Sequence, residues 1–107
     1  MKRGEIWTLR DDGYASKARP VVIVQSDDVN QFDSIILCLF TTFKSEHVTT
    51  RVLISANPEN GLKKDSYVMT EKIITVDKRD LGERVGILNA AQLNDISSKL
   101  KIILDIL

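Results

Sequence analysis

The sequence has few of the residues that build disulfides and metal sites. Its 107 residues include one cysteine, Cys38, and one histidine, His47. A single cysteine cannot form an intramolecular disulfide, and one Cys with one His does not supply the ligand set of a structural zinc site. His47 lies in a polar segment without a partner for base catalysis, which indicates a surface histidine. No carboxylate cluster has metal-ligand spacing either, so we expect neither a metal nor another cofactor.

The chain also lacks long hydrophobic runs. Its longest uninterrupted apolar run covers residues 35–40, whereas a membrane-spanning helix needs about 18 apolar residues. Lys2 and Arg3 stand near the N-terminus, but the apolar segment of a secretory signal peptide does not follow them. We therefore expect a cytoplasmic protein that does not contact a membrane.

Net charge is absent as well, because 15 Lys and Arg residues balance 15 Asp and Glu residues. A chain without an overall positive field is not built to coat nucleic acid by bulk charge. The first nineteen residues nevertheless carry five basic and three acidic side chains. Binding of a polyanion must then depend on where single charges lie, and it would involve few phosphate contacts.

The remaining composition is that of one folded domain. Hydrophobic residues make up 43% of the chain and charged residues 28%, close to the average of globular proteins. At this size, folding removes roughly two thirds of the unfolded chain's surface from water, and the length fits a single domain covering residues 1–107. Cys38 lies inside the apolar run 35–40, which favours a buried small hydrophobe over a reactive nucleophile.

Short strands are predicted over the first two thirds of the chain. In residues 5–10, Ile6 and Thr8 alternate with Trp7 and Leu9, as in a strand with two different faces. Two further segments are apolar on both faces, which is typical of central strands. These are residues 19–25 and 34–40; weaker strand candidates are residues 52–54, 66–70, 72–76 and 84–88. The segments 57–61 and 77–82 between them should be exposed connections.

The end of the chain has a helical period instead. Apolar residues recur there every three or four positions, which places them on one stripe of an α-helix. The stripe consists of Leu93, Ile96, Leu100, Ile103 and Leu107. Asn89 is a predicted N-cap with Gln92 as the second member of a capping box, so we expect a helix over residues 90–106. Its additional apolar residues indicate a subunit contact. The elements together predict a mainly β (α+β) fold, a small antiparallel β-barrel with a C-terminal α-helix.

Arg19 and the pair Thr41 and Thr42 are the candidates for phosphate chemistry. Arg19 begins the most apolar strand, so its guanidinium can hold a phosphate while its stem rests on packed residues. The alternative is a salt bridge to a nearby carboxylate, that of Glu5, Asp11 or Asp12. Thr41 and Thr42 directly follow a predicted buried strand, so two hydroxyls emerge where it reaches the surface. The alternative for them is that they only cap a turn.

Several segments match one known family when they are taken together. They are KRGEIW at residues 2–7, RPVVIVQ at 19–25, the strand ending in TT at 41–42, GLKKDS at 61–66, EKIITV at 71–76 and GERVG at 82–86. In this order they resemble the MazF/PemK toxins of toxin–antitoxin modules over essentially the whole chain. The resemblance implies a dimeric, SH3-like β-barrel endoribonuclease that cuts single-stranded RNA at short sequences without a metal. It also implies a cognate antitoxin protein that inhibits the enzyme.

The same resemblance assigns catalytic roles to Arg19 and Thr41, with Thr42 as the alternative to Thr41. It implies attack of a ribose 2′-OH on the adjacent phosphorus, giving a 2′,3′-cyclic phosphate and a 5′-OH, with the charge stabilised by these two side chains. It places further residues on the RNA-facing surface, namely Asp65, Ser66, Glu71 and Lys72. Relatives often carry Gln at position 72, so the recognised RNA sequence stays open.

The polar loop before Arg19 can add two RNA contacts. Tyr14 can stack on a base and Lys17 can contact a phosphate, as in proteins that bind single strands. For both, a solvated loop residue is the equal alternative. This loop is shorter than in several relatives, so the resemblance gives Tyr14 and Lys17 less support than the other site residues.

A non-catalytic function on the same barrel is the competing hypothesis. CcdB-type toxins trap DNA gyrase with a Trp-Gly-Ile-like C-terminus, whereas this chain has Asp105, Ile106 and Leu107 there. A degenerate member that only binds antitoxin or RNA is a third possibility, against which the retained Arg19 and Thr41 count. We therefore expect an endoribonuclease toxin whose partners are single-stranded RNA, an antitoxin protein and a second copy of the chain.

Overall fold

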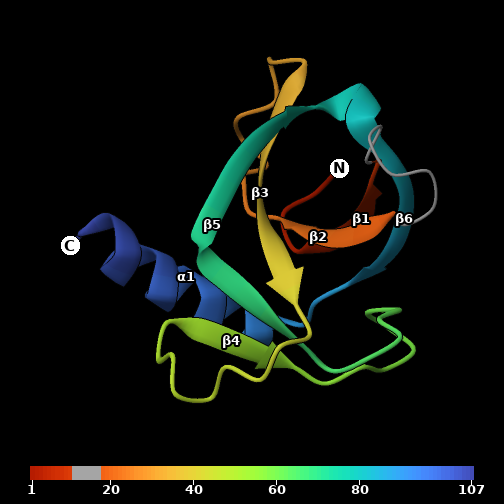
Figure 1. Cartoon of the computed structure of the whole chain (residues 1–107). Coiled ribbons are helices and arrows are strands. Elements are labelled where there is room, and N and C mark those ends of the chain that lie inside the picture. The colour runs from red at the N-terminus through yellow and green to blue at the C-terminus, as the bar shows by residue number, and fades with distance from the viewer. Residues whose placement is uncertain (11–17) are drawn as a thin grey trace.

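The computed structural model describes residues 1–10 and 18–107. In this part of the chain six strands are followed by a C-terminal helix, with one short 3-10 helix before the last strand (Figure 1). The elements are β1 (Glu5–Leu9), β2 (Arg19–Ile23), β3 (Ser34–Thr41), β4 (Arg51–Ile54), β5 (Ser66–Asp77), η1 (Lys78–Asp80), β6 (Leu81–Ile87) and α1 (Ala90–Leu104). The predicted strands are confirmed, with ends that shift by a few residues. The two strands predicted at residues 66–70 and 72–76 form one strand, β5.

The strands form a single antiparallel sheet in the order β4-β5-β3-β2-β1-β6. Figure 1 shows this sheet curling round as in a small barrel, with α1 outside it against β4 and β5. β2 and β3 lie inside the sheet, as their two apolar faces predict, and the predicted mainly β fold with a C-terminal helix is confirmed. Among the described residues, the edge strands β4 and β6 do not pair with each other, so the sheet is not closed. The connection after β4 bridges the gap, because the amide of Ile87 donates to the carbonyl of Glu59 at 2.9 Å.

β5 is one long strand where the sequence pattern predicts two. Its register against β3 jumps from Cys38 opposite Ile73 to Leu39 opposite Met69, so residues 70–72 form a bulge. A bulge shifts the alternation of side chains and bends the strand. The prediction of a break near residue 71 is therefore wrong about the element but right about the local irregularity.

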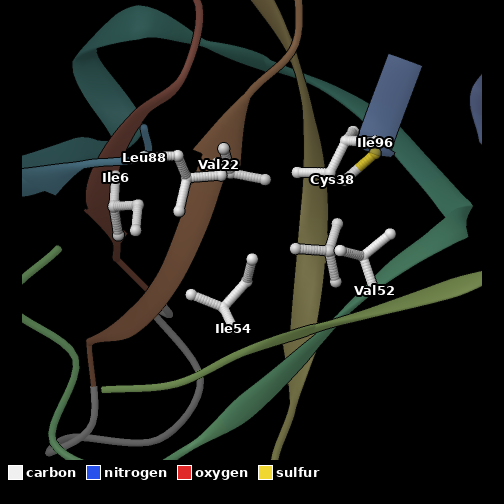
Figure 2. Close-up of a cluster of buried hydrophobic side chains, with 8 residues drawn as sticks. Ile6, Val22, Cys38, Val52, Ile54, Leu88 and Ile96 are labelled. Atoms are coloured by element: carbon white, nitrogen blue, oxygen red, sulfur yellow. The ribbon is translucent and has the colours of Figure 1, made fainter. Parts of the chain in front are cut away.

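Two hydrophobic clusters cover the two faces of the sheet. The helix-side cluster lies between the sheet and α1, and it contains Ile6, Val22, Cys38, Val52, Ile54, Val68, Leu88 and Ile96 (Figure 2). The second cluster occupies the other face, and it contains Val21, Ile23, Ile35, Leu37 and Leu81. Successive residues of a strand point to opposite faces, so β2 buries three residues in a row without any polar position between them.

The predicted placement of single core residues is also confirmed. Ile6 belongs to the helix-side cluster, whereas Trp7 and Leu9 pack against the second cluster, as the alternation in residues 5–10 predicts. Cys38 is fully buried, and burial raises the pKa of its thiol to about 12. It is therefore a core residue and not a reactive thiol.

The terminal helix starts where the capping signal predicts. The Asn89 side chain accepts the amide of Gln92 at 2.8 Å, and the Gln92 side chain accepts the amide of Asn89 at 3.0 Å. Ile96 is fully buried in the helix-side cluster, but the predicted stripe does not stay buried to its end. Ile103 and Leu107 are exposed, because the last turns of α1 extend beyond the sheet (Figure 1). In the described residues, no helix combines the length and the apolar character that crossing a bilayer requires.

The expectation of two exposed connections is wrong at Asn60 and Leu81. Asn60 is 1% exposed, since its side chain accepts the amides of Asn57 and Leu62 and donates to the carbonyl of Ser55. Leu81 begins β6 and lies in the second cluster. A buried asparagine of this kind is a structural residue, because its side chain forms hydrogen bonds with backbone groups of the loop that have no partner in a strand or helix.

Candidate active site

A groove of about 1030 Å³ borders the sheet where β2 begins and β3 ends. The two strands are antiparallel with Val21 opposite Leu39, so this register continues to place Arg19 opposite Thr41. The connection before β5 and the end of β6 form the other walls. The lining residues are Thr8, Ala18, Arg19, Pro20, Phe40, Thr41, Thr42, Gly61, Leu62, Lys63, Lys64, Ser66 and Val85. Three of the predicted site residues, Arg19, Thr41 and Ser66, therefore line one groove.

Arg19 is the first residue of β2, and it is exposed at the groove. The alternative of a salt bridge to Glu5 is wrong, because the Glu5 carboxylate instead accepts Nε of Arg84 at 2.9 Å. No ion pair joins Arg19 to another described residue. Asp11 and Asp12, the other carboxylates of that alternative, lie outside the described residues.

The hydroxyl of Thr41 has a defined position. Its Oγ1 accepts the backbone N–H of Phe43 at 3.1 Å, which is the turn-capping contact that the sequence allowed. That bond uses a lone pair of the oxygen, so the hydroxyl proton points elsewhere and can be donated. Thr42 also lines the groove, but it is exposed and its hydroxyl bonds to no described residue. Local order therefore favours Thr41 over Thr42.

The segment before β5 supplies residues of two kinds. Ser66 is buried at the groove, and its hydroxyl donates to the carbonyl of Lys64 at 2.9 Å. Asp65 accepts the amide of Ala56 at 2.8 Å and does not line the groove. Lys63 and Lys64 do line it, although they are not among the residues predicted for the site. Only their position beside the Asp-Ser pair pointed to them, and a lysine pair is common on any surface.

Glu71 and Lys72 lie on the bulge of β5 and do not line the groove. Glu71 accepts the guanidinium of Arg51 from β4, with Nη2 to Oε2 at 2.6 Å and Nε to Oε2 at 3.2 Å. These hydrogen bonds hold the pKa of the Glu71 carboxyl below its ordinary value. Lys72 is exposed. Tyr14 and Lys17, the predicted contacts of the loop before β2, lie outside the described residues.

The groove is basic in a chain without net charge. Its described lining contains Arg19, Lys63 and Lys64 and no acidic residue. The described residues also contain no group of three or more His, Cys, Asp or Glu side chains that could hold a metal ion. An exposed guanidinium beside an oriented hydroxyl can bind a phosphate group and stabilise additional charge on its oxygens.

Comparison with known proteins assigns the chain to a family. The family described as PemK-like, MazF-like toxin of type II toxin-antitoxin system matches residues 2–104. The chain belongs to the PemK/MazF-like toxin family. The resemblance of the sequence motifs to this family is thereby confirmed.

Relatives of this toxin family agree in length and fold. The protein named probable endoribonuclease MazF of Mycolicibacterium smegmatis is 37% identical over 87 residues, which cover 80% of each chain. The Mycobacterium tuberculosis toxin MazF-mt6 has a solved structure with a TM-score of 0.79 and 27% identity, covering 94% of this chain and 96% of that one. A mycobacterial endoribonuclease in complex with its cognate antitoxin gives a TM-score of 0.81 at 26% identity, covering 100% and 97%.

Proposed function

We propose that this chain is the toxin of a type II toxin–antitoxin module and acts as a metal-independent endoribonuclease on single-stranded RNA. The observation that carries the proposal is the placement of Arg19 and Thr41 on one basic groove. Relatives that are named endoribonucleases support the reaction class. The whole chain, residues 1–107, acts as one domain, and its place of action is the cytoplasm, where its substrate is made.

The reaction uses the RNA, the side chains of the groove and water as the proton carrier. The ribose 2′-oxygen attacks the adjacent phosphorus and loses its proton to water, while the bond from phosphorus to the 5′-oxygen breaks and that oxygen takes up a proton. The products are a 2′,3′-cyclic phosphate and a 5′-OH. Negative charge grows on the two non-bridging oxygens, where the Arg19 guanidinium binds and the Thr41 hydroxyl donates a hydrogen bond.

The remaining site residues are proposed RNA contacts. Ser66 lines the groove, and Asp65, whose carboxylate accepts the Ala56 amide, directly precedes it. Glu71 and Lys72 extend the surface along β5, and Tyr14 and Lys17 act from the loop before β2. Lys63 and Lys64 join them as phosphate contacts because they line the same groove as Arg19. Which base each residue reads decides the cleaved sequence.

Two protein partners belong to the proposal. A cognate antitoxin, supported by the complexes solved for similar toxins, inserts a disordered acidic and apolar segment into the groove. A second copy of the chain covers exposed apolar residues at the end of α1, among them Ile102, Leu104 and Ile106. Sedimentation equilibrium at micromolar concentration should then give twice the 12.1 kDa of one chain. A monomeric mass would contradict the dimer.

Cleavage of RNA by the purified protein in EDTA tests the function. The wild type should cut a long single-stranded RNA, and primer extension should map the cuts to one short sequence. Arg19→Ala and Thr41→Ala should lower kcat by about 100-fold or more, the usual effect of removing a group that stabilises a transition-state oxyanion. Thr42→Ala separates the two threonines, and it should cut like the wild type.

The controls separate loss of chemistry from loss of fold. Arg79→Ala removes an exposed arginine that does not line the groove and should leave cleavage unchanged. Circular dichroism and the melting temperature should stay close to those of the wild type in all variants. Cleavage that stops in EDTA, or persists in Arg19→Ala, would contradict the mechanism. Intact RNA together with loss of gyrase supercoiling would favour the CcdB-type alternative.

A further inference from the structure

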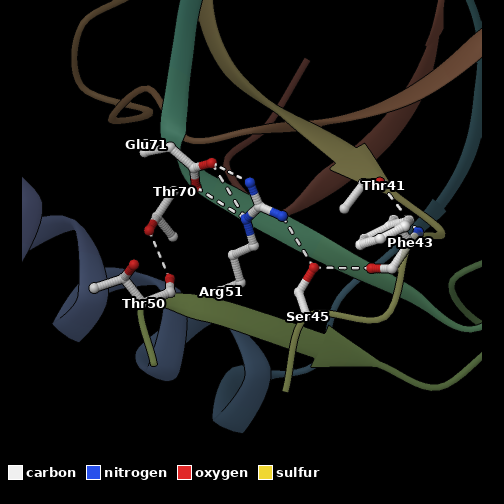
Figure 3. Close-up of polar contacts among 7 residues, drawn as sticks. All are labelled: Thr41, Phe43, Ser45, Thr50, Arg51, Thr70 and Glu71. Carbon is white, nitrogen blue, oxygen red and sulfur yellow. Dashed lines mark hydrogen bonds and ion pairs between the residues drawn. The ribbon is translucent and has the colours of Figure 1, made fainter. Parts of the chain in front are cut away.

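The connection between β3 and β4 is held by a chain of hydrogen bonds that starts at Thr41 (Figure 3). The N–H of Phe43 donates to Thr41 Oγ1 at 3.1 Å, and the carbonyl of Phe43 accepts the hydroxyl of Ser45 at 2.8 Å. Ser45 Oγ in turn accepts Nη1 of Arg51 at 2.9 Å. Arg51 ends the chain on the carboxylate of Glu71.

Ser45 is the central member of this chain. Its side chain is buried, with the residue only 1% exposed, and its single hydroxyl proton is committed to the Phe43 carbonyl. Removing that hydroxyl leaves a partly buried donor of Arg51 and the carbonyl of Phe43 without their partner. Leaving such groups unpaired costs free energy, which a local rearrangement avoids. We expect the backbone of Phe43 to rearrange, because Phe43 is an exposed residue of the connection.

The end of this hydrogen-bond chain opposite Thr41, the Arg51–Glu71 pair, is held in a fixed geometry. Arg51 and Glu71 stand on the adjacent strands β4 and β5, their side chains are only 20% and 31% exposed, and the pairing uses two guanidinium nitrogens. Paired nitrogens of this kind fix direction as well as distance. The far end of the connection is fixed too, because the fully buried Thr70 donates its hydroxyl to the carbonyl of Thr50 at 2.6 Å.

We propose that Ser45, held by the Arg51–Glu71 pair, is a positioning residue for the Thr41 hydroxyl. It acts through the Phe43 backbone, whose N–H fixes Thr41 Oγ1 and so directs the hydroxyl proton toward the groove. This inference rests on the proposed function of the groove. It also gives Glu71 a role that does not require contact with RNA, since its carboxylate sets the position of Arg51.

Another serine of the protein, Ser97, is a matched control for the positioning role of Ser45. Ser97 on α1 also accepts an arginine nitrogen, Nη2 of Arg3 at 2.8 Å, and also donates to a backbone carbonyl, that of Leu93 at 2.9 Å. The chemistry of its two bonds is the same as for Ser45, but it does not line the groove. A purely structural effect of losing such a serine should therefore appear equally in both alanine variants.

Steady-state RNA cleavage by the full chain separates the two cases. We expect Ser45→Ala to lower kcat by about 10- to 100-fold, the range for a small misplacement of a catalytic group. KM should change by less than about twofold, because ground-state binding of RNA is left intact. Ser45→Thr, which keeps the hydroxyl, should recover most of the rate, and Ser97→Ala should keep the kcat of the wild type.

Amide hydrogen exchange gives a readout that does not depend on activity. The Phe43 amide should exchange slowly in the wild type and much faster in Ser45→Ala, with no change at Phe43 in Ser97→Ala. Wild-type cleavage together with an unchanged kcat in Ser45→Ala overturns the positioning role alone, and so does an equal loss of kcat in Ser97→Ala. A wild type that leaves RNA intact overturns the proposed function, and the positioning role with it.

Discussion

The backbone of Gly86 in β6 lies directly against the backbone of Asn60, and no space for a side chain is left at position 86. This contact occurs where the sheet is open, between its edge strands β4 and β6. Asn60 is held in place by its own side-chain hydrogen bonds, so it cannot move away cheaply. The next two residues, Gly61 and Leu62, line the groove. Gly86 therefore links the packing across the open side of the sheet to the shape of the candidate active site.

Replacing this glycine should destabilise the protein. We expect Gly86→Ala to lower the free energy of unfolding by about 1–3 kcal/mol, the usual cost of overpacking a close contact. Urea denaturation followed by circular dichroism measures it. Gly82→Ala is the comparison, because there a methyl group meets chiefly the side chain of Thr8, whose rotation costs one hydrogen bond from the Glu83 amide and no backbone shift. Equal losses in the two variants would show that backbone contact at Asn60 does not matter.

The sequence predicts the regular parts of this fold better than its connections. The capping box at Asn89 and the apolar runs in β2 and β3 are local signals, so they could be interpreted without the fold. The burial of Asn60 depends on β6, which follows it by more than twenty residues, and no local pattern reveals such a contact. The exposed end of α1 has the same cause, since periodicity shows a stripe but not where the sheet beneath it ends.

The candidate site divides in the same way. The places of Arg19 and Thr41 at strand ends and the family motifs both point to these two residues, and the antiparallel register of β2 and β3 explains why they lie opposite each other. Lys63 and Lys64 could not be selected from the sequence, because lysines in a loop are usually solvated and only the fold places these two at the groove. Ser45 was missed for a related reason, since its importance depends on an arginine from another strand.

Cys38 should be unreactive while the protein is folded. Its pKa of about 12 leaves about one thiol in ten thousand ionised at pH 8, and the thiolate is the nucleophile. Full burial excludes the reagent as well. Ellman's reagent should therefore release no measurable colour from native protein within minutes, and one equivalent after unfolding in urea. Rapid labelling of the native state would contradict the buried position.

Stability should fall in acid through two carboxylates. Hydrogen bonds from Arg51 lower the pKa of Glu71. Burial would raise the pKa of Glu5. Hydrogen bonds from Lys2, Trp7 and Arg84 outweigh this effect of burial, so the pKa of Glu5 is also lowered. A lowered folded-state pKa gives stability that is fully present above the ordinary value of 4.5 and is lost as pH falls through the folded value. Urea denaturation at a series of pH values should show this decline.

Glu71→Gln isolates one of the two carboxylates. At neutral pH it should cost about 1 kcal/mol, because the charge on Arg51 loses its partner. Its stability curve should then approach that of the wild type as the pH falls through the lowered pKa of Glu71, where Glu71 itself becomes neutral. Glu83→Gln changes an exposed glutamate of β6, and its free energy of unfolding should depend on pH in the same way as that of the wild type. A constant gap between Glu71→Gln and wild type at every pH would refute the assignment.

The cap of α1 offers a test of helix docking. Asn89→Ala removes the side chain that accepts the Gln92 amide, and it should lower the free energy of unfolding by about 1 kcal/mol. Asn94→Ala, at an exposed position inside the same helix, should have little effect or a small stabilising one. The two variants are compared in urea at neutral pH. Equal stabilities would mean that the capping box does not contribute in solution.

The neutral total charge and the basic groove together predict how RNA affinity depends on salt. If Arg19, Lys63 and Lys64 each neutralise one phosphate, the logarithm of the association constant should fall with the logarithm of salt concentration with a slope of about −2 for a single strand. Lys63→Ala should reduce that slope by about 0.7 and weaken all RNA sequences alike. The measurement uses Thr41→Ala as background, so that the RNA stays intact, and fluorescence anisotropy as readout. Lys101→Ala on α1, away from the groove, should leave the slope unchanged. A much steeper slope would mean that RNA contacts many basic residues outside the groove. The RNA-binding surface would then be larger than the groove that Arg19, Lys63 and Lys64 line.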